Sequence, residues 1–169
     1  MAVGINGVAK QDVVSMSFAS AIDDIIVVPA VGADLDFPSV VIAGLPADAT
    51  IIRVDMILII GAILDTSSAE NQIKVGTTDA IYVKKSSGAW GTDDISALVF
   101  QALGLQVAAD GYRGGAVIFG ATDIKSEVDG NGTYNFRSEE TNRTKGVEAT
   151  GGTLELLDVS IVVRVWFKK

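Results

Sequence analysis

The segment Thr153–Lys169, TLELLDVSIVVRVWFKK, decides the fold class. From Val159 to Phe167 every second residue is apolar, and the other phase holds Asp158, Ser160, Arg164 and Lys168. Because successive side chains of a strand point to opposite faces, this alternation predicts a long β-strand with one buried face. Leu154 and Leu156 are out of phase with the later set, which predicts a β-bulge near Leu156 and Leu157.

The rest of the chain also favours strands. Val and Ile together number 38 against 10 Leu, and β-branched residues pack well on pleated sheets. The segment Thr50–Gly61 places one apolar face on alternate residues, namely Ile52, Val54, Met56, Leu58 and Ile60. Shorter runs predict strands at residues 12–19, 23–31, 38–46, 71–76, 80–85, 105–110, 116–121 and 133–138.

Within this pattern, residues 23–31 are expected to form a buried strand, and residues 71–76 and 80–85 a hairpin. About eight to ten short strands with 18 glycines between them predict an all-β fold. We expect an antiparallel β-sandwich or jelly roll, with a closed barrel as the alternative.

One segment departs from the β pattern. Apolar residues fall at helical spacing in TDDISALVFQALG, at Ile95, Leu98, Val99, Ala102 and Leu103. Thr92 is a candidate N-cap, and Gly104 suits the C-terminal end. The sequence therefore predicts one short helix over residues 93–103, which would lie across a sheet or close one end of a barrel.

The domain organisation is simple. Residues 1–11 have no period and are expected to form an extended arm, and residues 12–169 a single β-sandwich domain. Residues 138–152 are polar and without period, which predicts a long surface loop. The first residues carry no signal-peptide pattern, so we expect a cytoplasmic product with nothing removed.

Composition removes most catalytic chemistry. The chain has neither cysteine nor histidine, so thiolate nucleophiles, histidine bases and the usual zinc ligands are excluded. We expect no enzyme, no catalytic, metal-ligating or cofactor-binding residues and no cofactor. The net charge of −8, from 13 basic and 21 acidic residues, argues against nucleic acid. The most apolar run, residues 56–64, falls far short of the roughly 20 residues of a membrane-spanning helix.

The segment 127–138, EVDGNGTYNFRS, begins like a calcium loop. Oxygen-bearing side chains alternate with small residues, and Gly132 stands at the sixth position, as it does in an EF-hand. The twelfth position should hold a bidentate Glu but holds Ser138. Asp129-Gly130 and Asn131-Gly132 are strong turn dipeptides. We therefore expect a hairpin tip whose glycines take positive φ, and a weak cation site between Glu127 and Thr133 stays open.

Other suggestive residues are expected to be ordinary surface groups. These are the acidic residues Asp23, Asp24, Asp34, Asp36, Asp93 and Asp94, the triplets Asn131-Gly132-Thr133 and Asn142-Arg143-Thr144, and the tight turn Tyr112–Gly115.

Three large apolar residues fall outside the expected core. Val162 and Trp166 lie on the polar face of the last strand, and Trp90 lies in the Gly/Ser segment SSGAWGT. Such groups need cover, which another subunit, the helix or the N-terminal arm could provide.

The segments GLPADATIIRVDMILII (residues 44–60) and LELLDVSIVVRVWFKK (residues 154–169) resemble those of jelly-roll capsid decoration or cement proteins of tailed phages. The resemblance implies a non-enzymatic virion protein. Its partners would be further copies of itself, with a trimer among the symmetries, and the major capsid protein or another virion protein.

Three other functions stay open. Exposed aromatics of a sandwich bind sugars in carbohydrate-binding or adhesion modules, and the candidates are Trp90, Tyr82, Tyr112 and Trp166. A filament subunit would add its arm as a strand to a neighbour. A carboxylate-only enzyme ranks last.

Overall fold

The computed structural model describes residues 13–28, 34–66, 71–73, 80–93, 95–99, 105–107, 112–119, 123–138 and 153–169. Within these ranges the chain is all-β, and the expected antiparallel sandwich is confirmed. The strands are β1 (Val13–Ala19), β2 (Asp23–Val27), β3 (Leu35–Ile42), β4 (Thr50–Asp65), β5 (Asn71–Ile73), β6 (Ala80–Lys85), β7 (Ile95–Val99), β8 (Leu105–Val107), β9 (Tyr112–Phe119), β10 (Gly132–Ser138) and β11 (Leu154–Lys168).

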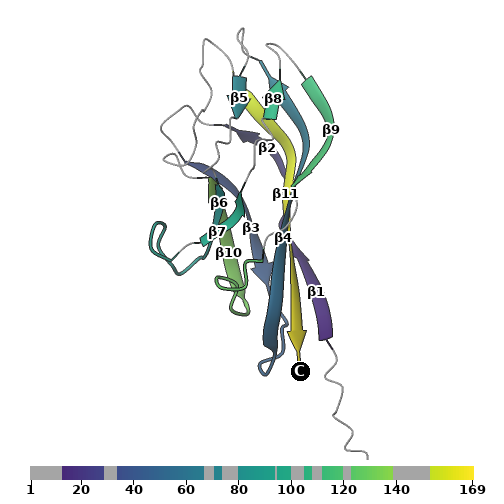
Figure 1. Ribbon diagram of the computed structural model, residues 1–169. Coiled ribbons are helices and arrows are strands. Elements are labelled where there is room, and N and C mark those ends of the chain that lie inside the picture. The colour runs from purple at the N-terminus through teal and green to yellow at the C-terminus, as the bar shows by residue number, and fades with distance from the viewer. Residues whose placement is uncertain are drawn as a thin grey trace, which may run out of the picture.

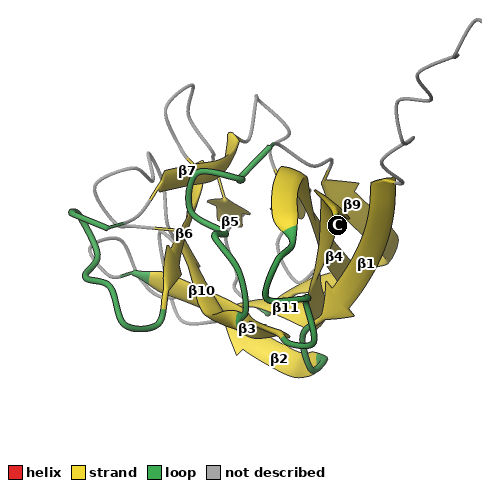
Figure 2. Cartoon of the chain, turned by 90° about the horizontal axis from the view of Figure 1, so that it is seen from below, coloured by secondary structure: helices red, strands yellow, loops and turns green. Residues whose placement is uncertain are grey.

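The sandwich consists of two antiparallel sheets. The larger has the order β1-β11-β4-β9, with β2 also paired to β11, and the smaller has the order β3-β10-β6-β7. Strands β5 and β8 form a separate antiparallel pair. Figure 1 shows β4 and β11 running side by side along the length of the molecule, and Figure 2 shows the strands of the two sheets on opposite sides of the core.

The pair β4–β11 is the longest ladder, and it extends from Leu154↔Asp65 to Lys168↔Thr50. The inward residues of β11 are those that the alternation predicted, since Val159, Ile161, Val163, Val165 and Phe167 are all buried. Four of the five residues expected on the inner face of β4 are also buried: Val54, Met56, Leu58 and Ile60. The smaller sheet contributes Leu35, Phe37, Val40, Ile42, Ile81, Val83, Tyr134 and Phe136 to the same core.

Both long strands change phase at one point. Asp158 is the non-glycine residue with positive φ (52°) in the described chain, and the buried set passes from Leu156 to Val159 across it. The change of phase was therefore predicted, but the predicted bulge is wrong, because the pairs Leu157↔Ala62 and Ser160↔Ile59 keep one register. The register of β4 with β11 shifts between Trp166 and Phe167 instead. Opposite Asp158 lies Gly61, where the register of β4 with β9 shifts. A Cβ atom at position 61 would lie 2.8 Å from the Cβ atom of Asp158. The two strands approach each other so closely at this pair that position 61 requires glycine.

Strands β1 and β2 lie one after the other along the same edge of β11. The register of β1 runs from Val13↔Lys168 to Ala19↔Val162, and β2 continues from Asp23↔Val159 to Glu155↔Val27. Ser20 joins them, because its backbone N–H donates to the Ile161 carbonyl at 2.8 Å and its Oγ accepts from the Ile161 N–H at 2.9 Å.

The predicted helix is wrong. Ile95–Val99 form β7, which pairs antiparallel with β6, and residues 100–104 lie outside the described residues. Ile95, Ala97 and Val99 also alternate with period two, and Ile and Val favour strands. Pairing with β6 therefore overrides the helical spacing. Asp93 closes its own loop instead of starting a helix, since its N–H donates to the Ala89 carbonyl and its Oδ2 accepts from the Ala89 N–H.

Three local expectations also need correction. The proposed hairpin is absent, because β5 pairs with β8 whereas β6 lies between β10 and β7. The segment Tyr112–Gly115 is part of β9 and not a turn. Strand β2 is an edge strand with Ile25 and Val27 more than half exposed, so the burial expected over residues 23–31 holds for Ile26 and Val28 among the described residues 23–28.

Several expectations fall outside the described residues: the arm at 1–11, the loop beyond Ser138, Asp94 and the triplet at Asn142. The division into an arm and one domain therefore stays a proposal. Among the described residues, none belongs to a helix long and apolar enough to cross a membrane.

The close approach of Gly61 to Asp158 gives a prediction about the stability of the fold. Gly61→Ala places a methyl group against the Asp158 side chain and should lower the free energy of unfolding by about 1–3 kcal/mol, as overpacking does. Gly130→Ala is the matched control, because a Cβ there meets nothing within 4 Å and φ is not positive. Urea unfolding of both variants would measure this, and equal stabilities would contradict the proposed close packing.

Candidate functional site

The outer face of the smaller sheet carries an aromatic residue on a fixed loop. Residues 86–93 join the end of β6 to the segment before β7, and Trp90 lies within them. Backbone hydrogen bonds from the Ser86 N–H to the Thr133 carbonyl (2.8 Å) and from the Gly88 N–H to the Lys85 carbonyl (2.9 Å) hold the loop. Gly91 has φ +78°, which a residue with a side chain rarely adopts. The loop thus returns Trp90 over the sheet.

Arg137 on β10 forms the centre of the polar groups beneath this loop. Its Nε donates to Asp36 Oδ1 at 2.6 Å, and its Nη1 donates to Asp34 Oδ2 at 2.8 Å. Its guanidinium carbon lies 4.8 Å from the centre of the Trp90 ring, a distance typical of cation–π stacking. Two carboxylates and one indole therefore fix the orientation of Arg137.

Lys84 supports Trp90 from the neighbouring strand. Its side chain is buried, and its Nζ lies 4.9 Å from the centre of the Trp90 ring. The same Nζ donates to the Gly88 carbonyl at 2.8 Å, which ties the base of the loop to the sheet. A buried ammonium needs such partners to offset its lost hydration.

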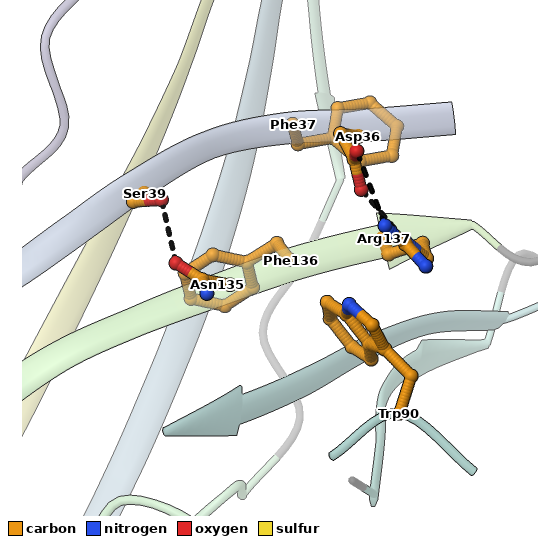
Figure 3. Close-up of a pocket in the computed structure, with 7 residues that line it drawn as sticks. All are labelled: Asp36, Phe37, Ser39, Trp90, Asn135, Phe136 and Arg137. Atoms are coloured by element: carbon orange, nitrogen blue, oxygen red, sulfur yellow. Dashed lines mark hydrogen bonds and ion pairs between the residues drawn. The ribbon is translucent and has the colours of Figure 1, made fainter. Parts of the chain in front are cut away.

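A hollow of about 230 Å³ opens beside Trp90, lined by Asp36, Phe37, Ser39, Trp90, Asn135, Phe136 and Arg137. Figure 3 shows Trp90 facing Arg137 and Asn135, while Asp36 and Ser39 reach β10 from the adjacent strand. Ser39 Oγ donates to Asn135 Oδ1 at 2.8 Å, which directs this amide oxygen toward β3. The hollow thus combines one aromatic ring with polar groups that the fold already orients.

The segment that resembles a calcium loop is built as a structural turn. Lys85 Nζ donates to Asp129 Oδ1 at 2.9 Å, and the Lys85 backbone N–H donates to Glu127 Oε1 at 3.1 Å. Asn131 bonds the backbone of Leu45 in both directions. The side-chain oxygens that would bind an ion are therefore directed at separate protein donors.

Two details of that segment were wrongly predicted. Ile124–Val128 form a turn in which the Val128 N–H donates to the Ile124 carbonyl at 3.0 Å, so a strand follows the loop but none precedes it directly. Gly130 and Gly132 do not take positive φ. In the described part of the chain, no three Asp or Glu residues come together as a metal site.

Tyr134 gives this turn its main buried contact. The ring is fully buried, and its hydroxyl bonds Asp129 Oδ1 at 3.0 Å and the Gly130 carbonyl at 2.9 Å. Burial, followed by the hydrogen bond and the negative charge of Asp129, raises the pKa of Tyr134 to about 12. The hydrogen bond from Lys85 is the largest influence on Asp129 and lowers the pKa of its carboxyl group.

A second surface lies on the outer face of the larger sheet, which we call the Trp166 face. It consists of Arg53, Asp55, Ile57, Ile59, Val162, Arg164 and Trp166. The guanidinium carbons of Arg53 and Arg164 lie 5.3 and 5.6 Å from the centre of the Trp166 ring. Asp55 holds Arg53 with an ion pair of 2.8 Å, and its hydrogen bond raises the pKa of Arg53.

The expected outer positions of Val162 and Trp166 are confirmed, since both are partly exposed and alternate with buried residues. Neither a helix nor another element of the described chain covers Trp166; instead arginine side chains lie over its ring. The side chains of Lys84 and Arg137 likewise lie over the ring of Trp90.

Only some of the acidic residues that the sequence analysis named lie at a candidate site. Asp34 and Asp36 are exposed, as expected of surface acids, and both also form ion pairs with Arg137, which the sequence did not predict. Their spacing of two residues was a usable signal, but Arg137 lies about a hundred residues away in the sequence. Asp23 and Asp24 stay exposed on β2. The Tyr112 side chain is not among those that the structure describes.

A scan against protein-family models finds no match, and a search of curated proteins finds none. Among solved structures the chain is similar to the crystal structure of the STIV MCP, a major capsid protein, with 11% identity and a TM-score of 0.38. The alignment covers 92% of this chain and 48% of that chain, so this chain spans about half the length of that protein.

The raised pKa of Tyr134 predicts a loss of stability in alkali. An unfolded tyrosine ionises near pH 10, whereas the folded state keeps Tyr134 protonated until about pH 12. The stabilisation that Tyr134 provides by staying protonated is therefore complete below pH 10. Between pH 10 and about pH 12 its loss lowers the free energy of unfolding by roughly 1.4 kcal/mol per pH unit.

Tyr134→Phe should remove this part of the pH dependence, whatever stability it loses at neutral pH. Urea unfolding of both proteins at several values between pH 9 and 12 measures the two slopes. Parallel pH profiles would show that Tyr134 ionises freely in the folded protein.

Proposed function

We propose that the protein is a non-enzymatic structural subunit of a virion that works as a homo-oligomer, in the manner of a capsid decoration or cement protein. The observation that supports association into a homo-oligomer is the composition of the Trp166 face. The sequence resemblance of residues 44–60 and 154–169 supports the virion part.

The composition of the Trp166 face is that of a protein interface. Trp and Arg are enriched at interfaces and supply most of the strong contacts, whereas Lys and Glu are depleted. Here Trp166 is stacked with two arginines beside Ile57, Ile59 and Val162. The arginines are held before any partner arrives, which lowers the entropy cost of association.

Edge strand β2 supplies a matching surface of opposite charge. Ile22, Ile25 and Val27 are 65, 55 and 52% exposed, and the exposed carboxylates Asp23 and Asp24 lie among them. An apolar edge strand of this kind is a site for association unless something covers it. Its acids complement Arg53 and Arg164, so the proposed occupant of the Trp166 face is the β2 edge of a second copy.

Such a contact joins two different surfaces of the same chain. Repeated contacts of this heterologous type close into a ring when the rotation allows and otherwise continue as a filament. A closed ring, with a trimer as the smallest symmetric example, suits a decoration protein. An open polymer would correspond to the filament subunit.

Charge exchange tests the contact. Asp24→Arg and Arg164→Asp should each shift the oligomer toward monomer, because each places like charges together. The two substitutions combined should restore assembly. Sedimentation velocity measures the distribution, with Ser87→Arg in the exposed loop after β6 as the control that leaves it unchanged. Single variants that assemble like the wild type would overturn this contact.

The arm and Trp166 are tested separately. Deletion of residues 1–10 should leave the sandwich folded and weaken oligomerisation or attachment, because an ordered arm must gain burial that offsets about 1–2 kcal/mol of backbone entropy per residue. Trp166→Ser should also weaken assembly. Light scattering measures both and circular dichroism confirms the fold; full assembly of both variants would contradict the proposed role of the two regions.

A further inference from the structure

We propose that the hollow beside Trp90 is a binding site for a neutral saccharide residue. The site lies on the smaller sheet, so it is separate from the Trp166 face and from the β2 edge, and it does not depend on the proposed oligomer.

Trp90 supplies the apolar half of the site. Its side chain stays partly exposed beside Lys84 and Arg137, so part of the ring is open to a ligand. The face of an indole ring carries partial negative charge and attracts the slightly positive C–H groups of a sugar ring. Arg137 and Lys84 both rise from the sheet on neighbouring strands, and their positive charges lie 4.8 and 4.9 Å from the ring centre. They fix the ring at the rim of the hollow that Figure 3 shows.

The polar groups of the hollow match hydroxyl groups. Asn135 has its oxygen committed to Ser39 Oγ at 2.8 Å, so its NH₂ group is directed away from that bond and is a donor. Asp36 offers carboxylate lone pairs beyond those that accept from Arg137. Donors and acceptors in planar side chains next to an aromatic ring are what a ligand with adjacent hydroxyls and an apolar face requires.

The charge balance selects a neutral ligand. Two cations, Lys84 and Arg137, lie beside two carboxylates, Asp34 and Asp36, so these four groups have no net charge. An anionic sugar or a phosphate would meet Asp36 at the wall of the hollow. A volume of about 230 Å³ suits one sugar residue and no long chain. A single site of this size should bind with a dissociation constant on the order of millimolar.

The two tryptophans make the test internally controlled, because the chain has only Trp90 and Trp166. Each gives one indole N–H signal in a nitrogen–proton NMR spectrum of the full chain, and Trp90→Phe and Trp166→Phe assign them. The probes are methyl glycosides of glucose, galactose, mannose and N-acetylglucosamine, with the methyl glycoside of sialic acid as the anionic comparison.

At least one neutral glycoside should shift the Trp90 signal in a saturable way and leave the Trp166 signal in place. Asn135→Ala should weaken this binding roughly tenfold, the loss expected for one or two hydrogen bonds to a ligand. Trp166→Phe should bind like the wild type even if its assembly changes, which separates this result from the fate of the proposed oligomer.

Three results would overturn the proposal: no saturable shift with any neutral glycoside, equal shifts of both tryptophans, or binding of the sialic acid glycoside alone. Unchanged affinity in a folded Asn135→Ala variant would show that the sugar lies elsewhere.

Discussion

The pairing of β4 with β11 is the constraint on which the rest of the structure depends. These two strands form the longest ladder, and every other strand of the larger sheet is hydrogen-bonded to one of them. Their inner faces supply much of the core that packs on the smaller sheet. The contact of Gly61 with Asp158 lets both strands change phase at the same place, so the core face stays apolar on both sides of the bend.

The same ladder separates the two surfaces with proposed functions. Because alternate residues of β11 point inward, Val162, Arg164 and Trp166 must point outward and make the Trp166 face. The Trp90 hollow lies on the outer face of the other sheet, beside Arg137 and Asn135 of β10. In both places an arginine stacked on an indole is fixed by a carboxylate, Asp55 or Asp36. The proposed subunit would thus associate through one sheet and present the proposed ligand site on the other.

Sequence reasoning succeeded where a signal was local and periodic. The alternation from Val159 to Phe167 predicted the buried face of β11, and the phase of Leu156 predicted the change of face near Asp158. The bulge expected there is absent, because the partner strand changes face at the same place and keeps the register. It failed at Ile95–Val99, because short apolar segments satisfy helical and strand spacing alike and pairing with β6 decides between them. The grouping of Arg137 with Asp34, Asp36 and Trp90 depends on contacts between distant segments, for which one sequence gives no pattern. Trp90 could be singled out, but its neighbours could not.

The central claim is that this sandwich is an assembling structural subunit, and native mass spectrometry of the wild-type protein over a range of concentrations tests it most directly. We expect one closed oligomer of defined copy number that dissociates to monomer on dilution or at high salt, because Arg–carboxylate contacts between copies are screened by ions. A protein that remains monomeric at every concentration would contradict it.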